Sequence, residues 1–587
     1  MRKRAALAAI FFVAAAALLA AEKPSLVVVI SVDQMRNDYL DRFRPYFARD
    51  GFNRFLQRGA RFPEARVRYA TTVTCAGHTA IGTGRDPRET GIVANDWYDR
   101  ANARRQYCVA DRNSRWVGPP ANAPAVTVAP ASPVWIDGDF VGDRFKEKFP
   151  GARVVSLSLK DRGAVPMGGR KADAVLWYVN GFQRFVTSSW YPATPLLAFN
   201  ERLPAFFASH ARWEPSGRIP EKDLGRITFQ PPELSRFSNP LPGTGDRFPH
   251  PLATSQSVVE SPFGDELVLE LARYATRELH IGKNPTGAPD LLFLGLSALD
   301  YYVHRFGPDS REAADGIVRL DAQLDAFFRW LDSEVGAGAT LVFLTADHGV
   351  TPIPEVARER ARRTNGRGRD DPNAAARIDY GTGPGAAAKV SDGSPDRVAL
   401  EKHLAAKFGY ALDLDAPNSL EGAILRFEEP IGFYLNRAVL ARRRLPSEDV
   451  KAAVRDWLRG RPGIRAAWTN TEIAAGLPAT EPLALPVERA FRADRSPDVV
   501  AYLRPGWSFR KEPGAAHGQP NDEDMRVPLL AWGAGVRAGS YGIRVSPESI
   551  AKTIGALYGF PAGGEDVEVL QPALGLDEET RAPAKTP

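Results

Sequence analysis

Cysteine is scarce in this chain, with two residues among 587. Two cysteines exclude a disulfide framework and a zinc site built from cysteine alone. A surplus of charge of one sign is also lacking, because 76 basic residues face 70 acidic ones. That near-neutral balance argues against nucleic acid as a specific partner. The hydrophobic share of 44% and the charged share of 25% are ordinary for a packed globular protein and exclude a disordered chain.

Long apolar runs are lacking beyond the first residues, so we expect no later segment to span a membrane. A basic head at residues 2–4 precedes an apolar stretch from Ala5 to Ala20 that ends in small residues. This stretch is shorter than the ~20 residues that cross a bilayer, and the pattern is typical of a secretory signal peptide. We therefore expect residues 1–21 to be removed and the protein to be periplasmic. An uncleaved membrane anchor is the alternative.

Five apolar runs predict buried strands, and each of them ends in polar or glycine-rich sequence. They are Leu26–Val32, Val154–Leu159, Leu291–Leu296, Thr340–Thr345 and Val527–Trp532. Continuous apolar runs suit strands that are covered on both faces, which indicates a largely parallel sheet flanked by helices. The segment Arg311–Val335 repeats apolar residues at helical spacing and predicts one such helix. The fold class is therefore α/β.

Long segments without a clear helical or strand periodicity separate these runs. We expect one catalytic domain over residues 22–575, with insertions near 96–255 and 355–500, and a flexible tail at 576–587. In the second insertion, Ala423–Phe427 and Gly432–Leu435 predict a pair of strands. Inserted loops often shape access to a site, so we expect the insertions to form a cap.

Acidic and histidine residues follow several of the predicted strands. Asp33 comes directly after the run Leu26–Val32, at the strand end where α/β enzymes place functional groups, although a turn or helix-capping residue is the alternative. Asp300 and His304 follow another run, and a helix there would put both on one face. A surface Asp–His pair is the competing interpretation.

Two further histidines lie beside glycine. Asp347 and His348 can face one ion only if the chain turns, which Gly349 permits. His517 lies in a Gly- and Ala-rich loop before the last predicted strand, where it has no apolar surface to fill. Nitrogen and carboxylate ligands without thiolates suit zinc, with open positions for a substrate.

Thr74 is the candidate nucleophile. The small residues that follow it allow a helix to begin close behind it, so its hydroxyl would lie at a positive helix end. A bound metal lowers the pKa of a hydroxyl and lets threonine act without a histidine base. Thr74 is one of several threonines here, and a helix-capping role is the alternative.

Six motifs follow one another along the chain: Asp33, Thr72-Val-Thr-Cys-Ala-Gly-His78, Gly91-Ile-Val-Ala-Asn-Asp-Trp-Tyr98, Asp300-x-x-x-His304, Asp347-His348-Gly349 and His517. In this order they resemble the alkaline phosphatase superfamily. The resemblance is greatest to the bacterial alkaline phosphatases with a threonine nucleophile, which are related to nucleotide pyrophosphatase/phosphodiesterases. The resemblance implies two zinc ions, one held by Asp33, Thr74, Asp347 and His348, and the other by Asp300, His304 and His517. It also implies a phosphothreonine on Thr74 and a hydrogen bond from Asn95 to a phosphoryl oxygen.

Lys160 and Arg162 bear on the choice between monoesters and diesters. They stand two apart at the end of a predicted strand, so we expect both to project to one face and Asp161 to point away. A phosphate monoester carries one more negative charge than a diester, and two cations favour its transition state. The pair resembles the Lys-x-Arg of the monoesterase branch. A solvated strand end is the alternative.

The chain departs from the family pattern in a few places. Thr90 stands where many relatives have histidine, no third metal site is evident, and Cys75 lacks the flanking residues of the sulfatase branch. In an oxidising compartment we expect Cys75 and Cys108 to bridge around Asn95, with a buried free thiol as the alternative. We expect His78 and the remaining histidines, His210, His250, His280 and His403, to be structural or surface residues.

The sequence thus predicts an exported dizinc alkaline phosphatase that acts on small-molecule phosphate monoesters, with a monomer favoured. One alternative is a phosphodiesterase or nucleotide pyrophosphatase on the same scaffold. A more remote one is a protein that binds zinc or phosphate without catalysis.

Overall fold

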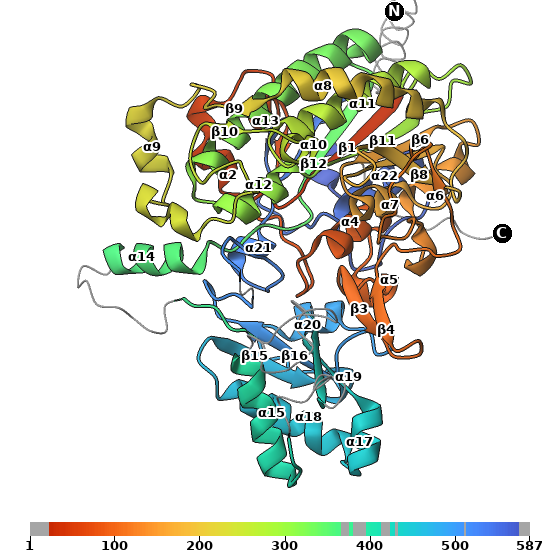
Figure 1. Cartoon of the computed structure of the whole chain (residues 1–587). Helices are drawn as coiled ribbons and strands as arrows, with labels where there is room; N and C mark the ends of the chain where they lie inside the picture. Colours follow the sequence, from red (N-terminus) through yellow and green to blue (C-terminus); the bar gives the residue numbers. More distant parts are fainter. Residues whose placement is uncertain are drawn as a thin grey trace, which may run out of the picture.

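The computed structural model describes residues 23–364, 375–379, 395–412, 423–428, 432–509 and 512–574. The expected leader at 1–21 and the tail at 576–587 lie outside the described residues. A ten-stranded sheet forms the centre of the molecule in the order β18-β2-β17-β12-β1-β11-β6-β7-β8-β5 (Figure 1). Its outer strands are β2 (Ala60–Arg61), β5 (Trp116–Val117), β8 (Arg184–Ser188) and β18 (Gly539–Ser540).

The middle of the sheet is parallel, as the apolar runs predict. β1 (Leu26–Val32) lies between β11 (Asp290–Leu296) and β12 (Thr340–Thr345), and every residue of these strands is buried. β6 (Val154–Ser158) and β7 (Ala174–Val179) continue the parallel part beyond β11. The last predicted run forms β17 (Leu529–Gly533), which pairs antiparallel with β12. The α/β fold is thereby confirmed.

Helices cover the sheet in two groups. One group contains α11 (Phe263–Glu278), α12 (Ala298–Phe306) and α13 (Arg311–Leu331), and the other contains α4 (Thr74–Thr83), α6 (Val141–Lys148), α7 (Asp161–Gly168) and α22 (Ser549–Tyr558) (Figure 1). The helix predicted from Arg311 is α13, and it starts where the Ser310 hydroxyl accepts a hydrogen bond from the main-chain N–H of Ala313. The chain then continues as a π-helical turn over Asp332–Gly336.

A second, smaller sheet lies apart from the first, in the lower part of Figure 1. Its antiparallel strands run in the order β13 (Leu425–Glu428), β14 (Gly432–Leu435), β16 (Val499–Leu503) and β15 (Ile464–Thr469). α15 (Pro395–Phe408) and α18 (Ser447–Arg459) contribute Leu400 and Val454 to a hydrophobic cluster separate from the main core. The strand pair predicted near residues 423–435 is present as β13 and β14.

No helix among the described residues is long and apolar enough to cross a membrane.

Candidate active site

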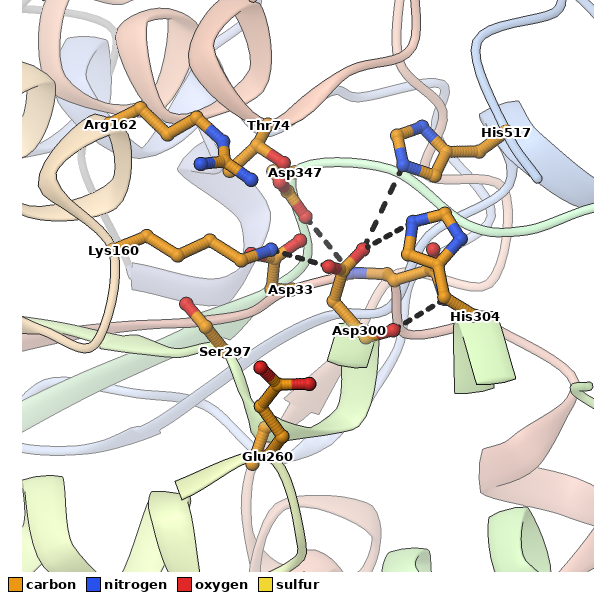
Figure 2. A network of polar contacts seen from close by, with 12 residues as sticks. Asp33, Thr74, Lys160, Arg162, Glu260, Ser297, Asp300, His304, Asp347 and His517 are labelled. Atoms are coloured by element: carbon orange, nitrogen blue, oxygen red, sulfur yellow. Dashed lines mark hydrogen bonds and ion pairs between the residues drawn. The ribbon is translucent and has the colours of Figure 1, made fainter. Parts of the chain in front are cut away.

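The predicted site residues converge at the carboxyl ends of the central strands (Figure 2). Asp33 follows β1, and Asp347 and His348 follow β12. Asp300 and His304 lie on α12, which begins just after β11. Because these three strands are parallel neighbours, their carboxyl ends meet at one edge of the sheet. His517 lies beside His304, across the site from Lys160 and Arg162 (Figure 2).

One group of ligand atoms is formed by Asp300, His304 and His517. The Nε2 atom of His304 lies 3.2 Å from Asp300 Oδ1, and that of His517 lies 3.7 Å from the same oxygen. The pair on α12 is four residues apart and shares one helix face, as the spacing predicts. The ligand atoms of all three residues lie within 4.8 Å of one another, which suits a single metal ion.

A second group surrounds His348. Its Nε2 lies 3.3 Å from Asp347 Oδ2 and 3.7 Å from Asp33 Oδ1. These three atoms are buried and have no hydrogen-bond partner. Asp300 joins this group as well, because its ligand atom and those of Asp33 and His348 lie within 4.8 Å of one another. Buried polar atoms without partners are costly unless a cation satisfies them, so a second metal ion fits here.

The three histidines are oriented as metal ligands. Each directs its Nδ1 to a main-chain carbonyl, which leaves the Nε2 lone pair facing the carboxylates. The Nδ1–O distances are 2.8 Å from His304 to Ala515, 2.9 Å from His348 to Gly349 and 2.7 Å from His517 to Thr72. Burial and the neighbouring imidazoles hold the pKa of His517 well below its ordinary value, so this ring is neutral and ready to bind metal.

The carboxylates are an unfavourable concentration of buried negative charge. Burial and the neighbouring Asp347 raise the pKa of Asp33 to about 6, against the lowering effect of Lys160. Burial also acts on Asp300, but Lys160 and His304 hold its pKa well below the ordinary value. The Nζ atom of Lys160 lies 2.7 Å from Asp33 Oδ2 and 2.5 Å from Asp300 Oδ2. Positive charge is therefore what this cluster requires.

Thr74 lies at the first position of α4 and is 1% exposed. The helix begins where the small residues predict it. A Cβ atom at Gly77 would lie 2.5 Å from Asp347 Cβ, so glycine lets α4 pack directly against the strand end that carries a ligand. Figure 2 shows Thr74 on the same side of the site as Asp347 and Arg162.

Asn95 is held against the start of the same helix. Its Oδ1 accepts a hydrogen bond of 2.8 Å from the main-chain N–H of Cys75. Since that N–H can only donate, the amide oxygen faces the helix and the NH₂ group is directed elsewhere, as a donor. The structure forms the expected disulfide between Cys75 and Cys108, and the N–H of Cys108 donates to the carbonyl of Asn95.

The expected strand geometry of Lys160 and Arg162 is wrong. β6 ends at Ser158, and the chain then enters α7, with Lys160 just before the helix and Arg162 in its first turn. Asp161 does not point away from them, because its Oδ1 accepts a hydrogen bond of 2.5 Å from the Tyr107 hydroxyl, which also lies 3.3 Å from Arg162 Nη1. Both cations nevertheless reach into the site (Figure 2).

We expected glycine at position 349 because it permits a turn of the chain. The structure gives a different reason, since the backbone of Gly349 does not adopt a positive φ. A Cβ atom there would lie 2.0 Å from the carbonyl oxygen of Glu523, so glycine is required for this close approach of two chain segments. The N–H of Gly349 donates to the carbonyl of Asp524 at 2.7 Å.

His78 lies directly beside the candidate site. It is fully buried, and its Nδ1 lies 2.9 Å from the carbonyl of Thr74 and 3.2 Å from Asp347 Oδ2. Burial lowers the pKa of His78, but Asp347 outweighs it and the net shift is upward. The sequence indicates this proximity, because His78 follows Thr74 by four residues on the same predicted helix.

Two buried carboxylates outside the predicted set hold the ligand-bearing segments in place. Asp265 Oδ1 accepts the N–H of Ala298 at 2.9 Å, at the start of α12. Asp524 accepts the N–H of Gln519 at 2.9 Å and the hydroxyl of Thr351 at 2.8 Å, and so connects the His517 loop to the segment after His348. Such supporting contacts orient metal ligands.

The family model described as type I phosphodiesterase / nucleotide pyrophosphatase matches residues 27–526, a span that includes every candidate metal ligand described above. The chain belongs to this family. It is therefore a hydrolytic enzyme, and its fold is that of the alkaline phosphatases: the crystal structure of alkaline phosphatase PafA matches with a TM-score of 0.80 and 26% identity, over 95% of this chain and 100% of that one.

Curated relatives agree with this placement. The chain is 31% identical to alkaline phosphatase PhoK of Sphingomonas sp, over 93% of this chain and 90% of the relative. It is 29% identical to alkaline phosphatase PafA of Elizabethkingia meningoseptica, over 92% and 93% of the two chains. A PafA variant substituted at one threonine, one asparagine, one lysine and one arginine is also similar in structure, with a TM-score of 0.77 and 26% identity over 95% of this chain and 100% of that one.

Proposed function

We propose that this protein hydrolyses phosphate monoesters, with Thr74 as the nucleophile and two zinc ions as cofactors. The observation that carries the proposal is that Thr74, at the start of α4, lies beside Asp347 in a site where three imidazole Nε2 atoms face buried carboxylates (Figure 2). The similarity to bacterial alkaline phosphatases supports the same activity.

The two ligand groups divide between two ions. Asp33, Asp347 and His348, together with Thr74, would hold one, and Asp300, His304 and His517 would hold the other. Bound zinc supplies Lewis acidity, which lowers the pKa of a coordinated hydroxyl and stabilises charge on a departing oxygen. Nitrogen and oxygen ligands without thiolates suit zinc at both positions.

Thr74 carries the covalent chemistry. Its hydroxyl loses a proton to solvent, and the oxygen attacks phosphorus opposite the ester oxygen, which leaves as the alcohol after taking up a proton. The resulting phosphothreonine is attacked by water, which releases phosphate and restores the hydroxyl. The N-terminal end of α4 favours the negative phosphoryl group, and the NH₂ of Asn95 can donate to one of its oxygens.

Lys160 and Arg162 support monoesters over diesters. A monoester dianion has one more charge than a diester and no second organic group, so two cations at its oxygens favour its transition state. Arg162 is held by Tyr107, and Lys160 already lies between two carboxylates of the site. A threonine, an asparagine, a lysine and an arginine are also the residue types substituted together in the PafA variant.

The deciding experiment compares kcat/KM of the zinc-loaded protein for an aryl phosphate and for the methyl diester of the same aryl group. We expect the monoester to be preferred and Lys160→Ala/Arg162→Ala to reduce that preference by ~100-fold or more. The control is Arg144→Ala/Lys171→Ala, which removes two surface cations that pair with Glu147. A preference for the diester would place the enzyme with the phosphodiesterases, and bound zinc without turnover of either would indicate a non-catalytic protein.

We further propose export to the periplasm, with cap-forming insertions near residues 96–255 and 355–500 in a single catalytic domain. The Cys75–Cys108 disulfide supports an oxidising compartment. The mass of the mature protein from a periplasmic extract tests the cleavage expected after residue 21.

A further inference from the structure

The chain segment that leads to Asn95 contacts the part of the molecule that carries the smaller sheet. The segment begins at Gly91, directly after α5 (Pro87–Thr90), and Asn95 comes just before β3 (Asp96–Asp99). Arg495, which precedes β16 of the smaller sheet, lies against it, although Gly91 and Arg495 are 404 positions apart in the chain. A group of the candidate active site is thus reached from a distant part of the sequence.

The guanidinium of Arg495 contacts the chain on both sides of Asn95. Its Nη1 donates a hydrogen bond of 2.8 Å to the carbonyl of Gly91, four residues before Asn95. The carbon at the centre of the guanidinium lies 5.0 Å from the ring centre of Trp97, two residues after Asn95. The same Nη1 donates to the carbonyl of Trp135 at 2.7 Å, and the rings of Trp97 and Trp135 meet edge-on with their centres 6.2 Å apart. One cation therefore holds the main chain before Asn95 and the aromatic ring after it.

Gly91 is suited to this contact in two ways. Its φ is +76°, which favours glycine. A Cβ atom there would lie 2.5 Å from Arg495 Nη1 and 2.8 Å from Arg495 Cζ. The lack of a side chain at position 91 therefore lets the guanidinium reach the main-chain carbonyl.

Arg495 is itself fixed by its surroundings. Its side chain is 12% exposed, with Nη2 at 3.8 Å from Asp137 Oδ2 and Nε at 3.7 Å from Asp494 Oδ2. Its main-chain carbonyl accepts a hydrogen bond of 2.7 Å from the hydroxyl of Tyr434, which lies on β14 of the smaller sheet. A guanidinium held in this way transmits the position of the smaller sheet to the segment before Asn95.

The side chain of Asn95 depends on that position. Its Oδ1 accepts the N–H of Cys75 at 2.8 Å, next to Thr74, and its carbonyl accepts the N–H of Cys108 at 2.9 Å. A shift of the main chain at Asn95 would weaken these bonds and turn the NH₂ group away from the phosphoryl oxygen that it is proposed to bind. A misplacement of ~1 Å in a group that orients the substrate is enough to lower a rate strongly.

We infer that Arg495 is a positioning residue for Asn95, so that the smaller sheet takes part in phosphoryl binding. The inference rests on the proposed monoesterase activity and assigns a further residue to it. Arg495 acts through the carbonyl of Gly91 and the ring of Trp97.

A double-mutant cycle with Asn95 tests this role. Arg495→Ala should lower kcat/KM of the zinc-loaded protein for the aryl monoester about tenfold, but less than about twofold when Asn95→Ala is already present. The loss shrinks because Asn95→Ala removes the group that Arg495 positions. The control is Arg455→Ala on α18, which removes an arginine that pairs with Glu472 at 2.7 Å and should leave kcat/KM unchanged.

Chemical rescue separates positioning from a general loss of stability. Guanidinium ion at a non-denaturing concentration can replace the missing side chain in Arg495→Ala, where the carbonyls of Gly91 and Trp135 and the ring of Trp97 remain as partners. We expect it to raise kcat/KM of Arg495→Ala several-fold and to leave Asn95→Ala/Arg495→Ala unchanged. Sodium chloride at the same ionic strength should raise neither.

If Arg495→Ala does not fold, Arg495→Lys takes its place in the cycle. Lysine keeps the charge but lacks the flat guanidinium, so we expect a smaller loss that again disappears with Asn95→Ala. Equal losses in the presence and absence of Asn95, or a rescue by guanidinium that is as large in the double variant, overturn the inference while monoesterase activity stands.

Binding of inorganic phosphate keeps this inference apart from the proposed function. Phosphate offers Asn95 the same oxygens as the ester, so Arg495→Ala should weaken its affinity for the zinc-loaded protein about tenfold in calorimetry, and much less with Asn95→Ala present. If the unaltered protein hydrolyses no monoester, the proposed function fails, and this cycle still decides the role of Arg495. Phosphate affinity that Arg495→Ala leaves unchanged overturns the inference.

Discussion

The hydroxyl of Tyr107 accepts a hydrogen bond of 3.3 Å from Arg162 Nη1 while it donates one of 2.5 Å to Asp161 Oδ1. Burial and the Asp161 carboxylate raise the pKa of Tyr107 well above its ordinary value, so the phenol stays neutral and keeps its proton for this bond. Tyr107 ends β4 (Arg104–Tyr107), and Cys108 follows it with the disulfide to Cys75. One hairpin thus supports Arg162 and the start of the helix that carries Thr74.

Tyr107→Phe tests whether this contact positions Arg162. The substitution keeps the ring and removes the hydroxyl, so we expect kcat/KM for the aryl monoester to fall about tenfold, the loss typical of a hydrogen bond to a charged group. In a double-mutant cycle, Tyr107→Phe should have little further effect in the Arg162→Ala background. Tyr98→Phe, on the paired strand β3 (Asp96–Asp99), is the control. Independent, multiplying effects of the two substitutions would contradict the positioning role.

Removal of a single histidine should remove a single ion. His304→Ala or His517→Ala deletes one of three ligands in the Asp300 group, so we expect about half the bound zinc of the unaltered protein and loss of turnover. Metal content by mass spectrometry, measured after removal of unbound ions, gives the stoichiometry. His403→Ala, on the exposed face of α15, should bind as much zinc as the unaltered protein. Unchanged stoichiometry in His517→Ala would remove that residue from the ligand set.

Gly349→Ala should weaken both folding and metal binding. The added Cβ would lie 2.0 Å from the carbonyl oxygen of Glu523, so one of the two segments must move, and His348 is next to the altered position. We expect a loss of unfolding free energy of roughly 1–3 kcal/mol in urea denaturation, together with weaker zinc affinity. Gly338→Ala has open space around its Cβ and serves as the control. Equal stability of the two variants would show that the segments can separate without cost.

Glu548 should make stability depend on pH. Burial and the neighbouring Asp86 raise its pKa to about 7, above the ordinary value of 4.5. Between these values the folded protein keeps a proton that the unfolded chain has lost, so the free energy of unfolding falls as the pH rises from about 4.5 to about 7. Glu548→Gln removes this contribution and should make the fall of the urea-derived stability between pH 5 and pH 7 shallower, while the raised pKa values of Asp265 and Asp524 keep part of the slope. The exposed Glu565→Gln should leave the slope unchanged, and an unchanged slope in Glu548→Gln would contradict the contribution of Glu548.

The sequence alone determined the central strands of the sheet and the candidate ligands that follow them. Continuous apolar runs such as Leu26–Val32 are typical of buried strands, and polar residues directly after neighbouring parallel strands meet at one edge. The interval between Asp300 and His304 places both on one helix face whatever the rest of the fold does. These features depend on residues that are close in the chain, so their pattern is readable without coordinates.

Tertiary structure decided the rest, because it depends on contacts between residues far apart in the chain. Strand spacing misplaced Lys160 and Arg162, since the alternation of Leu159 and Lys160 after Ser158 does not reveal whether the strand continues or a helix begins. The hydrogen bond from Arg162 to the hydroxyl of Tyr107 likewise brings together segments that no local pattern connects. Side-chain packing selects such partners by shape and burial, and those quantities exist only once the chain has folded.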